Sequence, residues 1–176
     1  MFLVETISYE VAKKLNDIEV RRYSRIVAAK VEGYGDGGFG MLFRFISGQN
    51  SRSSRVAMTS PVLSEKVAMT APVISGQGSI AFVMPRGYTL ETTPRPIDKS
   101  IRILEIPQRY LAVLRFSGRW TERAFQAKST ELLGTLEKAG IATRGEVLFM
   151  RYNSPFSPWF LRRNEVAVEV DFQLRR

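Results

Sequence analysis

Apolar and polar residues alternate along several stretches of the chain, and this alternation predicts strands. The first three predicted strands cover residues 9–14, 18–23 and 25–33, and Asn16-Asp17 forms a turn between the first two. Further strands are expected over residues 80–85, 101–106, 110–116, 147–152 and 165–172. Strands therefore dominate the expected fold.

Two other segments have the spacing of an amphipathic helix. The first is about ten residues long and follows the glycine-rich stretch 33–38. Phe39, Leu42, Phe43 and Ile46 recur at helical intervals in it, so they are expected to form one apolar face.

The second helix has clearer ends than the first. Thr121 is the expected N-cap, Glu122 suits the positive end of the helix dipole, and Gly140 ends the helix. Its expected buried stripe consists of Phe125, Leu132, Leu133, Leu136 and Ala139. The pattern predicts a fold of strands with two helices.

The sequence repeats itself on two scales. The short phrase VAMTSPV at 56–62 returns as VAMTAPV at 67–73, where the prolines favour strand edges or bends. At an offset of 85 residues, 26–33 falls on 111–118, and 79–84 falls on 164–169. Each half then has the order strand, strand, helix, strand, strand, with pseudo-repeats at roughly 9–88 and 100–172. This order predicts an α+β fold in which two halves form one domain over residues 1–176, related by a pseudo-twofold axis.

Composition fits an ordinary globular protein with a basic surface. Of 176 residues, 44% are hydrophobic and 24% charged, and the net charge is +9 with a pI near 10.2. The basic residues are dispersed in small groups such as Arg21-Arg22, so specific nucleic-acid binding is not expected. A solvated surface, or a general preference for acidic ligands, explains the charge. No apolar run has the length of a membrane span and the N-terminus does not resemble a signal peptide, so we expect a soluble, cytoplasmic protein.

The chain contains no histidine and no cysteine. Their absence excludes disulfides, thiolate or histidine zinc sites, and catalysis by Ser-His-Asp or Cys-His groups. The remaining residue types form no motif of a known reaction class, so we do not expect an enzyme. Glu165, Glu169 and Asp171 point the same way along the last predicted strand, where a charged outer face is favoured over paired catalytic carboxylates.

Four segments together resemble a known family. They are MTAPV at 69–73, FVMP at 82–85, the stretch 112–120 that ends in FSGRW, and WFLRRNEV at 159–166. In this order, and over residues 9–170, the sequence resembles the SOUL haem-binding protein family. The resemblance implies a distorted barrel-like antiparallel sheet with two helices, built from two βαββ repeats. It also implies a fold related to gyrase-inhibitor-like ligand-binding domains, in which a buried acidic residue receives a cationic ligand. Glu165 or Glu169 would take that role if buried.

The resemblance further implies haem or another tetrapyrrole as ligand, bound in an apolar groove beside the first helix. Matched onto this sequence, the groove residues are Phe39, Leu42, Phe43 and Arg44, with Met58 and Met69 from the repeated phrase. Arg44 would pair with a propionate. Without histidine, the iron would be bound by Met, Tyr or Lys, or the haem would be held by apolar burial and propionate pairing alone.

Two interpretations of these residues remain open. The apolar helix residues suit simple core packing as well as a groove, and the methionines suit gap-filling as well as ligation. The function expected from the resemblance is a non-enzymatic haem carrier, buffer or sensor. The alternative is a small-molecule-sensing domain that binds a different amphipathic or cationic ligand.

Overall fold

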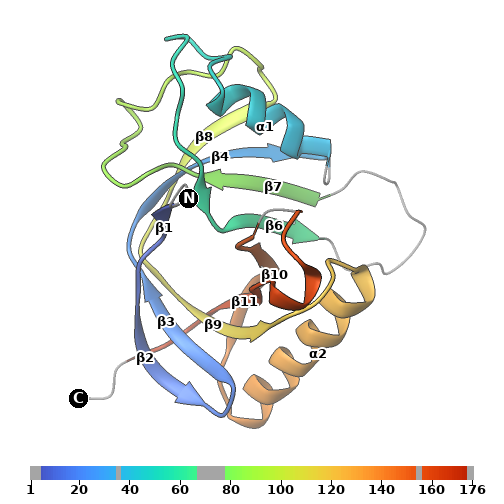
Figure 1. Cartoon of the computed structure of the whole chain (residues 1–176). Helices are drawn as coiled ribbons and strands as arrows, with labels where there is room; N and C mark the ends of the chain where they lie inside the picture. Colours follow the sequence, from blue (N-terminus) through green and yellow to red (C-terminus); the bar gives the residue numbers. More distant parts are fainter. Residues whose placement is uncertain (1–4, 35–36, 67–77, 154–155, 174–176) are drawn as a thin grey trace. The chain divides into compact units, whose positions relative to one another are not determined.

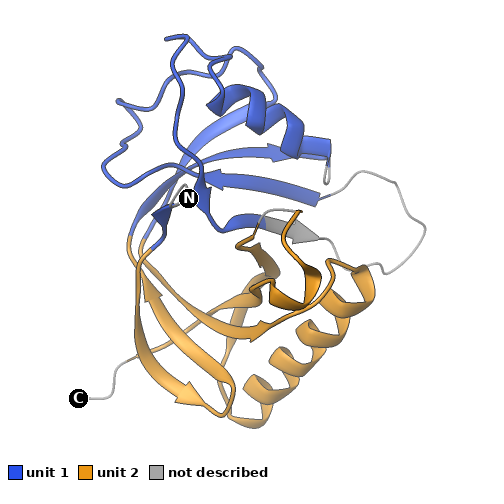
Figure 2. Ribbon diagram, viewed as in Figure 1, with its two compact units in different colours: residues 1–7, 25–107 blue, residues 8–24, 108–176 orange. Residues whose placement is uncertain are grey.

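Figure 1 shows the computed structural model of the chain, which describes residues 5–34, 37–66, 78–153 and 156–173. The chain divides into two compact units (Figure 2). Unit 1 consists of residues 1–7 and 25–107, and unit 2 consists of residues 8–24 and 108–176. The hairpin near the N-terminus therefore belongs to the same unit as the C-terminal third of the chain.

Unit 1 contains four antiparallel strands in the order β6-β7-β4-β8. Their bounds are Ile26–Glu32 for β4, Val62–Lys66 for β6, Gly78–Val83 for β7 and Ile101–Ile106 for β8. A short parallel pair joins β1 (Glu5–Thr6) to β5 (Thr59–Ser60) in the same unit. The repeated phrase therefore contributes strand as well as turn, because β5 and the start of β6 lie in its first copy.

Helix α1 (Gly38–Ile46) packs on one face of this sheet. The shared core contains Val27, Ala29, Val31, Leu42, Phe45, Ile46, Ile80 and Phe82. The helix approaches the sheet closely at Gly38, where a Cβ atom would lie only 2.6 Å from Cγ2 of Ile80. This contact favours glycine and fixes which side of α1 faces the strands.

Unit 2 contains five antiparallel strands in the order β2-β3-β9-β11-β10. Their bounds are Tyr9–Leu15 for β2, Ile18–Tyr23 for β3, Arg109–Phe116 for β9, Thr143–Arg151 for β10 and Asn164–Val170 for β11. Asn16, in the turn between β2 and β3, has a φ of 54°. Asparagine tolerates this left-handed conformation better than most residues, as the predicted turn requires.

Helix α2 (Glu122–Lys138) covers one face of the unit 2 sheet. Its N-cap is Thr121, whose hydroxyl accepts a 3.2 Å hydrogen bond from the backbone N–H of Ala124. The core beneath it contains Phe125, Leu132 and Leu136 with Ile18, Val20, Ala112, Leu114, Phe149, Val166, Val168 and Val170. The capped, amphipathic helix expected from the sequence is confirmed.

The α+β class is confirmed, but three details of the expectation are wrong. Neither strand order closes on itself among the described residues, so the sheet is open and not closed into a barrel. Leu133 and Ala139 on α2 were expected to face the core and are exposed instead, and Phe43 on α1 does not share the buried face of Leu42 and Ile46. Strand β6 was not anticipated, because the repeated phrase was interpreted as turns and edges. The second phrase, at 67–73, lies outside the described residues, and the pseudo-twofold symmetry stays a prediction.

Candidate functional site

The outer face of α1 presents aromatic surface. Phe43 is 50% exposed, and its ring lies nearly parallel to that of Phe39, at an interplanar angle of 10° and a centroid distance of 6.3 Å. Phe39 is partly buried and meets the core ring of Phe82 edge-on at 5.1 Å. The core therefore supports Phe39, and Phe39 in turn supports one side of the exposed Phe43 ring.

A cationic group lies beside this aromatic surface. Gly40 is a surface neighbour of both Phe43 and Arg44, which follow it by three and four residues on the helix. A Cβ atom at Gly40 would lie 3.8 Å from Nη1 of Arg44, so the guanidinium reaches back toward the glycine. Gly40 itself adds no side chain to this surface, where the Arg44 guanidinium is the nearest group.

The structure brings together only part of the predicted groove. Phe39, Phe43 and Arg44 lie on or next to the exposed side of α1, whereas Leu42 is fully buried in the core. Met58 is partly buried and packs against the same unit 1 core. Met69 lies outside the described residues.

A second, polar depression in unit 1 was missed by sequence reasoning. It has a volume of about 350 Å³ and is lined by Lys30, Glu32, Tyr34, Lys99, Ser100 and Arg102. Glu32 lies 3.5 Å from both Lys30 and Arg102, so part of the positive charge is already compensated. Lys30 and Glu32 alternate along β4 with the residues that face α1, so the depression lies on the opposite face of the sheet.

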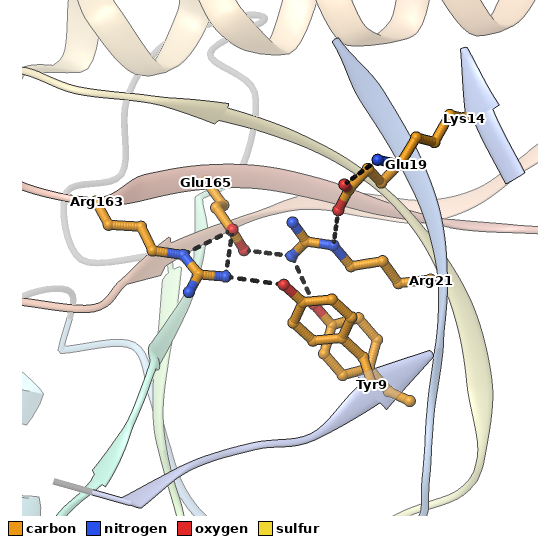
Figure 3. A network of polar contacts seen from close by, with 7 residues as sticks. Tyr9, Lys14, Glu19, Arg21, Arg163 and Glu165 are labelled. Carbon is orange, nitrogen blue, oxygen red and sulfur yellow. Dashed lines mark hydrogen bonds and ion pairs between the residues drawn. The ribbon is translucent and has the colours of Figure 1, made fainter. Parts of the chain in front are cut away.

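Unit 2 contains a buried ionic network on the sheet face opposite α2 (Figure 3). At its centre, the Glu165 side chain on β11 is fully buried. One of its carboxylate oxygens accepts a 2.9 Å hydrogen bond from Nη1 of Arg21 on β3. The other accepts bonds of 3.0 and 2.8 Å from Nε and Nη2 of Arg163. One buried carboxylate is therefore held between two guanidinium groups.

The neighbours of Glu165 complete this network. Arg21 also donates to Glu19 at 2.8 Å and to the Tyr23 hydroxyl at 3.1 Å, and its guanidinium lies 4.1 Å from the ring centre of Tyr9. Arg163 donates to the Tyr9 hydroxyl at 3.3 Å. The two buried charges, Arg21 and Glu165, therefore compensate each other, while the partly exposed Glu19 also lies 3.8 Å from Lys14.

Burial and charge shift the pKa values of this network. Burial lowers the pKa of Arg21, but Tyr23 and Glu165 act more strongly together and the net direction is upward. Burial raises the pKa of Tyr23 to about 12, although Arg21 acts in the opposite direction. Burial also raises the pKa of Tyr152, and Tyr23 and Glu165 add to that effect. Arg21 therefore stays charged and both tyrosines stay neutral near pH 7.

The position of Glu165 corrects the expectation of a charged outer face on the last strand. Glu165 is buried, whereas Glu169, four residues further along the strand on the same face, is only partly buried. The buried position of Glu165 is the one that the resemblance to gyrase-inhibitor-like domains associates with a cationic ligand. Here, however, Arg21 and Arg163 already occupy both oxygens of that glutamate.

Tyr23 predicts a loss of stability in alkaline solution. Its pKa is raised from 10.0 in the free side chain to about 12 in the folded chain, so the unfolded chain loses this proton first. Tyr23 therefore contributes stability that is complete below pH 10 and is lost as the pH rises toward 12, by roughly 2 kcal/mol. Urea unfolding from pH 8 upward should show a smaller alkaline loss in Tyr23→Phe than in the wild type. Tyr34→Phe, at an exposed site, should behave like the wild type, and an identical alkaline loss in Tyr23→Phe would contradict the assignment.

Neither a metal-binding cluster nor a membrane-spanning helix occurs among the described residues. In those ranges no three carboxylates gather closely enough to hold a metal ion, and the chain has no histidine or cysteine. Within the same ranges, no helix is both long and apolar enough to cross a bilayer.

Solved structures share this fold at very low sequence identity. The C-terminal domain of EcmrR has a TM-score of 0.60 and 8% identity, with 93% of this chain and 98% of that chain covered. A hydrolase from Listeria innocua has a TM-score of 0.59 and 10% identity, with coverages of 91% and 94%. Identities this low establish the fold alone. No curated protein sequence matches the chain.

The family is shown by the sequence itself. The profile described as SOUL heme-binding protein matches residues 4–169, which is nearly the whole chain. The match includes all the segments that suggested the resemblance, and the α+β architecture of the described residues agrees with it. The chain therefore belongs to the SOUL heme-binding protein family.

Proposed function

We propose that the protein binds haem or another tetrapyrrole on the outer face of α1 and acts without catalysis, as a carrier, buffer or sensor. Family membership supports the ligand class. The observation that carries the site is the half-exposed ring of Phe43 next to Arg44, whose guanidinium lies near Gly40.

The residues on α1 suit the chemistry of a tetrapyrrole. A flat macrocycle gains most from contact with a flat apolar surface, which the supported Phe43 ring offers. A propionate gains from a guanidinium, which Arg44 offers at the edge of that surface. Since Met58 packs against the core and the chain has no histidine, the haem would be held by apolar contact and propionate pairing. The bound group would supply any iron chemistry, while the chain would hold and orient it.

A titration with hemin tests this site. We expect saturable binding with a change in the Soret band, and Arg44→Glu should weaken it by about fivefold, the scale of an exposed charge pair. The matched control is Arg102→Glu, which makes the same charge change at an exposed arginine in the polar depression of unit 1. Weaker binding in Arg102→Glu alone would move the site to that depression. Absence of saturable binding by the wild type would refute the proposed function.

The sensing alternative has two supporting features and one opposing feature. The fold is shared with the EcmrR C-terminal domain, and Glu165 is buried as a cation receptor would require. A cationic ligand would, however, have to displace Arg21 or Arg163 from that carboxylate. Tetrapyrrole binding therefore stays the first proposal.

We further propose that the chain is one cytoplasmic domain of two βαββ repeats. The 85-residue offset supports the repeats. When the sequence is shifted by this offset, β4 overlaps β9 and β7 overlaps β11.

A further inference from the structure

An exposed cluster of large apolar side chains lies in unit 2 and is not used by the proposed haem site. We call it the aromatic turn. It consists of Phe156, Trp159, Phe160 and Leu161, which are 96%, 49%, 58% and 68% exposed. These four residues lie within six positions of the sequence. Isolated exposed apolar residues are ordinary, but a contiguous group of this kind indicates a contact surface.

Local hydrogen bonds hold the aromatic turn in place. Trp159–Leu161 forms a 3-10 turn, drawn in orange-red in Figure 1, in which the N–H of Leu161 donates to the carbonyl of Pro158 at 3.0 Å. Nε of Arg162 donates to the carbonyl of Ser157 at 2.9 Å. The rings of Trp159 and Phe160 meet edge-on at 5.6 Å. The apolar groups are therefore presented by an ordered segment.

Positive charge surrounds the aromatic turn. Residues 147–164 and 106–121 each contain three arginines and no acidic residue, although Arg163 pairs with Glu165 and Arg109 with Glu169. The two segments meet in space, because the guanidinium of Arg119 lies 5.5 Å from the ring centre of Trp159. Arg162 and Arg151 lie 4.5 and 5.4 Å from the ring centre of Trp120. Exposed aromatic groups and cations thus occupy one region of unit 2.

We propose that the aromatic turn docks the protein on an anionic lipid surface. Tryptophan and other large apolar side chains enter the boundary between headgroups and acyl chains, where arginines pair with anionic headgroups. Each basic residue near such a surface adds attraction, and the chain's net charge of +9 attracts it over a longer range. A protein partner matched to this region would need acidic groups around an apolar recess. An anionic bilayer supplies both features without a specific shape.

Vesicle sedimentation without haem tests the proposal independently of the haem site. The wild type should sediment with vesicles of phosphatidylcholine mixed with phosphatidylglycerol, and far less with phosphatidylcholine alone. Added salt should weaken the binding. Leu161→Ser should weaken it roughly tenfold, since it removes an inserted apolar side chain. The matched control is Ile97→Ser in unit 1, because Ile97 and Leu161 are both 68% exposed, and it should leave binding unchanged.

Charge and fluorescence provide two further readouts. Arg119→Glu should weaken vesicle binding by about fivefold or more. Arg86→Glu, an exposed arginine of unit 1, should change it much less. Wild-type emission should shift to shorter wavelengths with mixed vesicles, and Trp159→Phe should lose that shift although Trp120 remains. No sedimentation with mixed vesicles, or equal binding by Leu161→Ser and Ile97→Ser, would overturn the proposal.

Discussion

Replacing Glu165 by alanine is expected to lower the free energy of unfolding by about 3–5 kcal/mol. The change leaves Arg21, which is only 3% exposed, without its fully buried partner. Arg163 loses both of its short bonds to the same carboxylate. Arg21 keeps its bond to the partly exposed Glu19, but the loss of its buried partner leaves the cost of burying the guanidinium poorly compensated. Urea unfolding near pH 7 measures the effect.

Glu169→Ala is the matched control on the same strand and the same face. Glu169 is partly exposed and lies 3.7 Å from Arg109, so its loss should cost less than about 1 kcal/mol. A double variant, Arg21→Met with Glu165→Leu, should recover much of the stability lost in Glu165→Ala, because it removes both buried charges. Equal losses in the Glu165 and Glu169 variants would show that the network does not stabilise the fold.

Leu42→Ala should show that the buried side of α1 contributes to stability and not to hemin binding. Leu42 is fully buried against the unit 1 sheet, so the smaller side chain leaves a cavity and costs about 2–5 kcal/mol of stability. Hemin affinity of the folded protein should stay unchanged, because the side chain does not reach the exposed side of the helix. Thermal unfolding and a hemin titration below the transition measure the two quantities.

Phe43→Ala should show the opposite pattern. Phe43 is half exposed, so its removal should cost less than about 1 kcal/mol of stability. Hemin affinity should fall by about five- to tenfold with the loss of the aromatic contact. If Leu42→Ala weakened hemin binding while Phe43→Ala did not, the ligand would lie inside the helix–sheet interface and the outer-face site would be wrong.

The strands and α2 were predictable because their signals are local. The bounds of β3 and β8 agree with the alternation in the sequence, and the N-cap Thr121 was recognisable from its own residue type and its neighbours. Contacts between residues far apart in the sequence were not predictable from the same local signals. Nothing near Glu165 indicates that its partner Arg21 comes from 144 residues earlier in the chain. Alternation along β11 assigned Glu165 to a face but did not show that this face is buried.

The orientation of α1 illustrates the same limit. The sequence predicted one apolar face of Phe39, Leu42, Phe43 and Ile46, suited to core packing or to a ligand groove. The structure shares Leu42 and Ile46 with that set but buries Phe45 and exposes Phe43. Apolar residues lie on both sides of the predicted stripe, so periodicity alone does not choose between neighbouring rotations of the helix. The close approach of Gly38 to Ile80 favours the observed rotation, and that contact is invisible in the sequence.

The division of the chain between the units has a consequence for synthesis on the ribosome. The main segment of unit 1 is continuous, from residue 25 to residue 107, so its strand pairs β4–β7 and β4–β8 are available once that segment has emerged. Unit 2 includes residues 8–24, whose strand β3 pairs with β9 at Ile18 and Leu114. The hairpin made first must therefore wait, with one edge unpaired, until β9 has been translated. The β2–β3 hairpin is therefore synthesised before the main segment of unit 1, but its strand pairing is completed only after that segment has emerged.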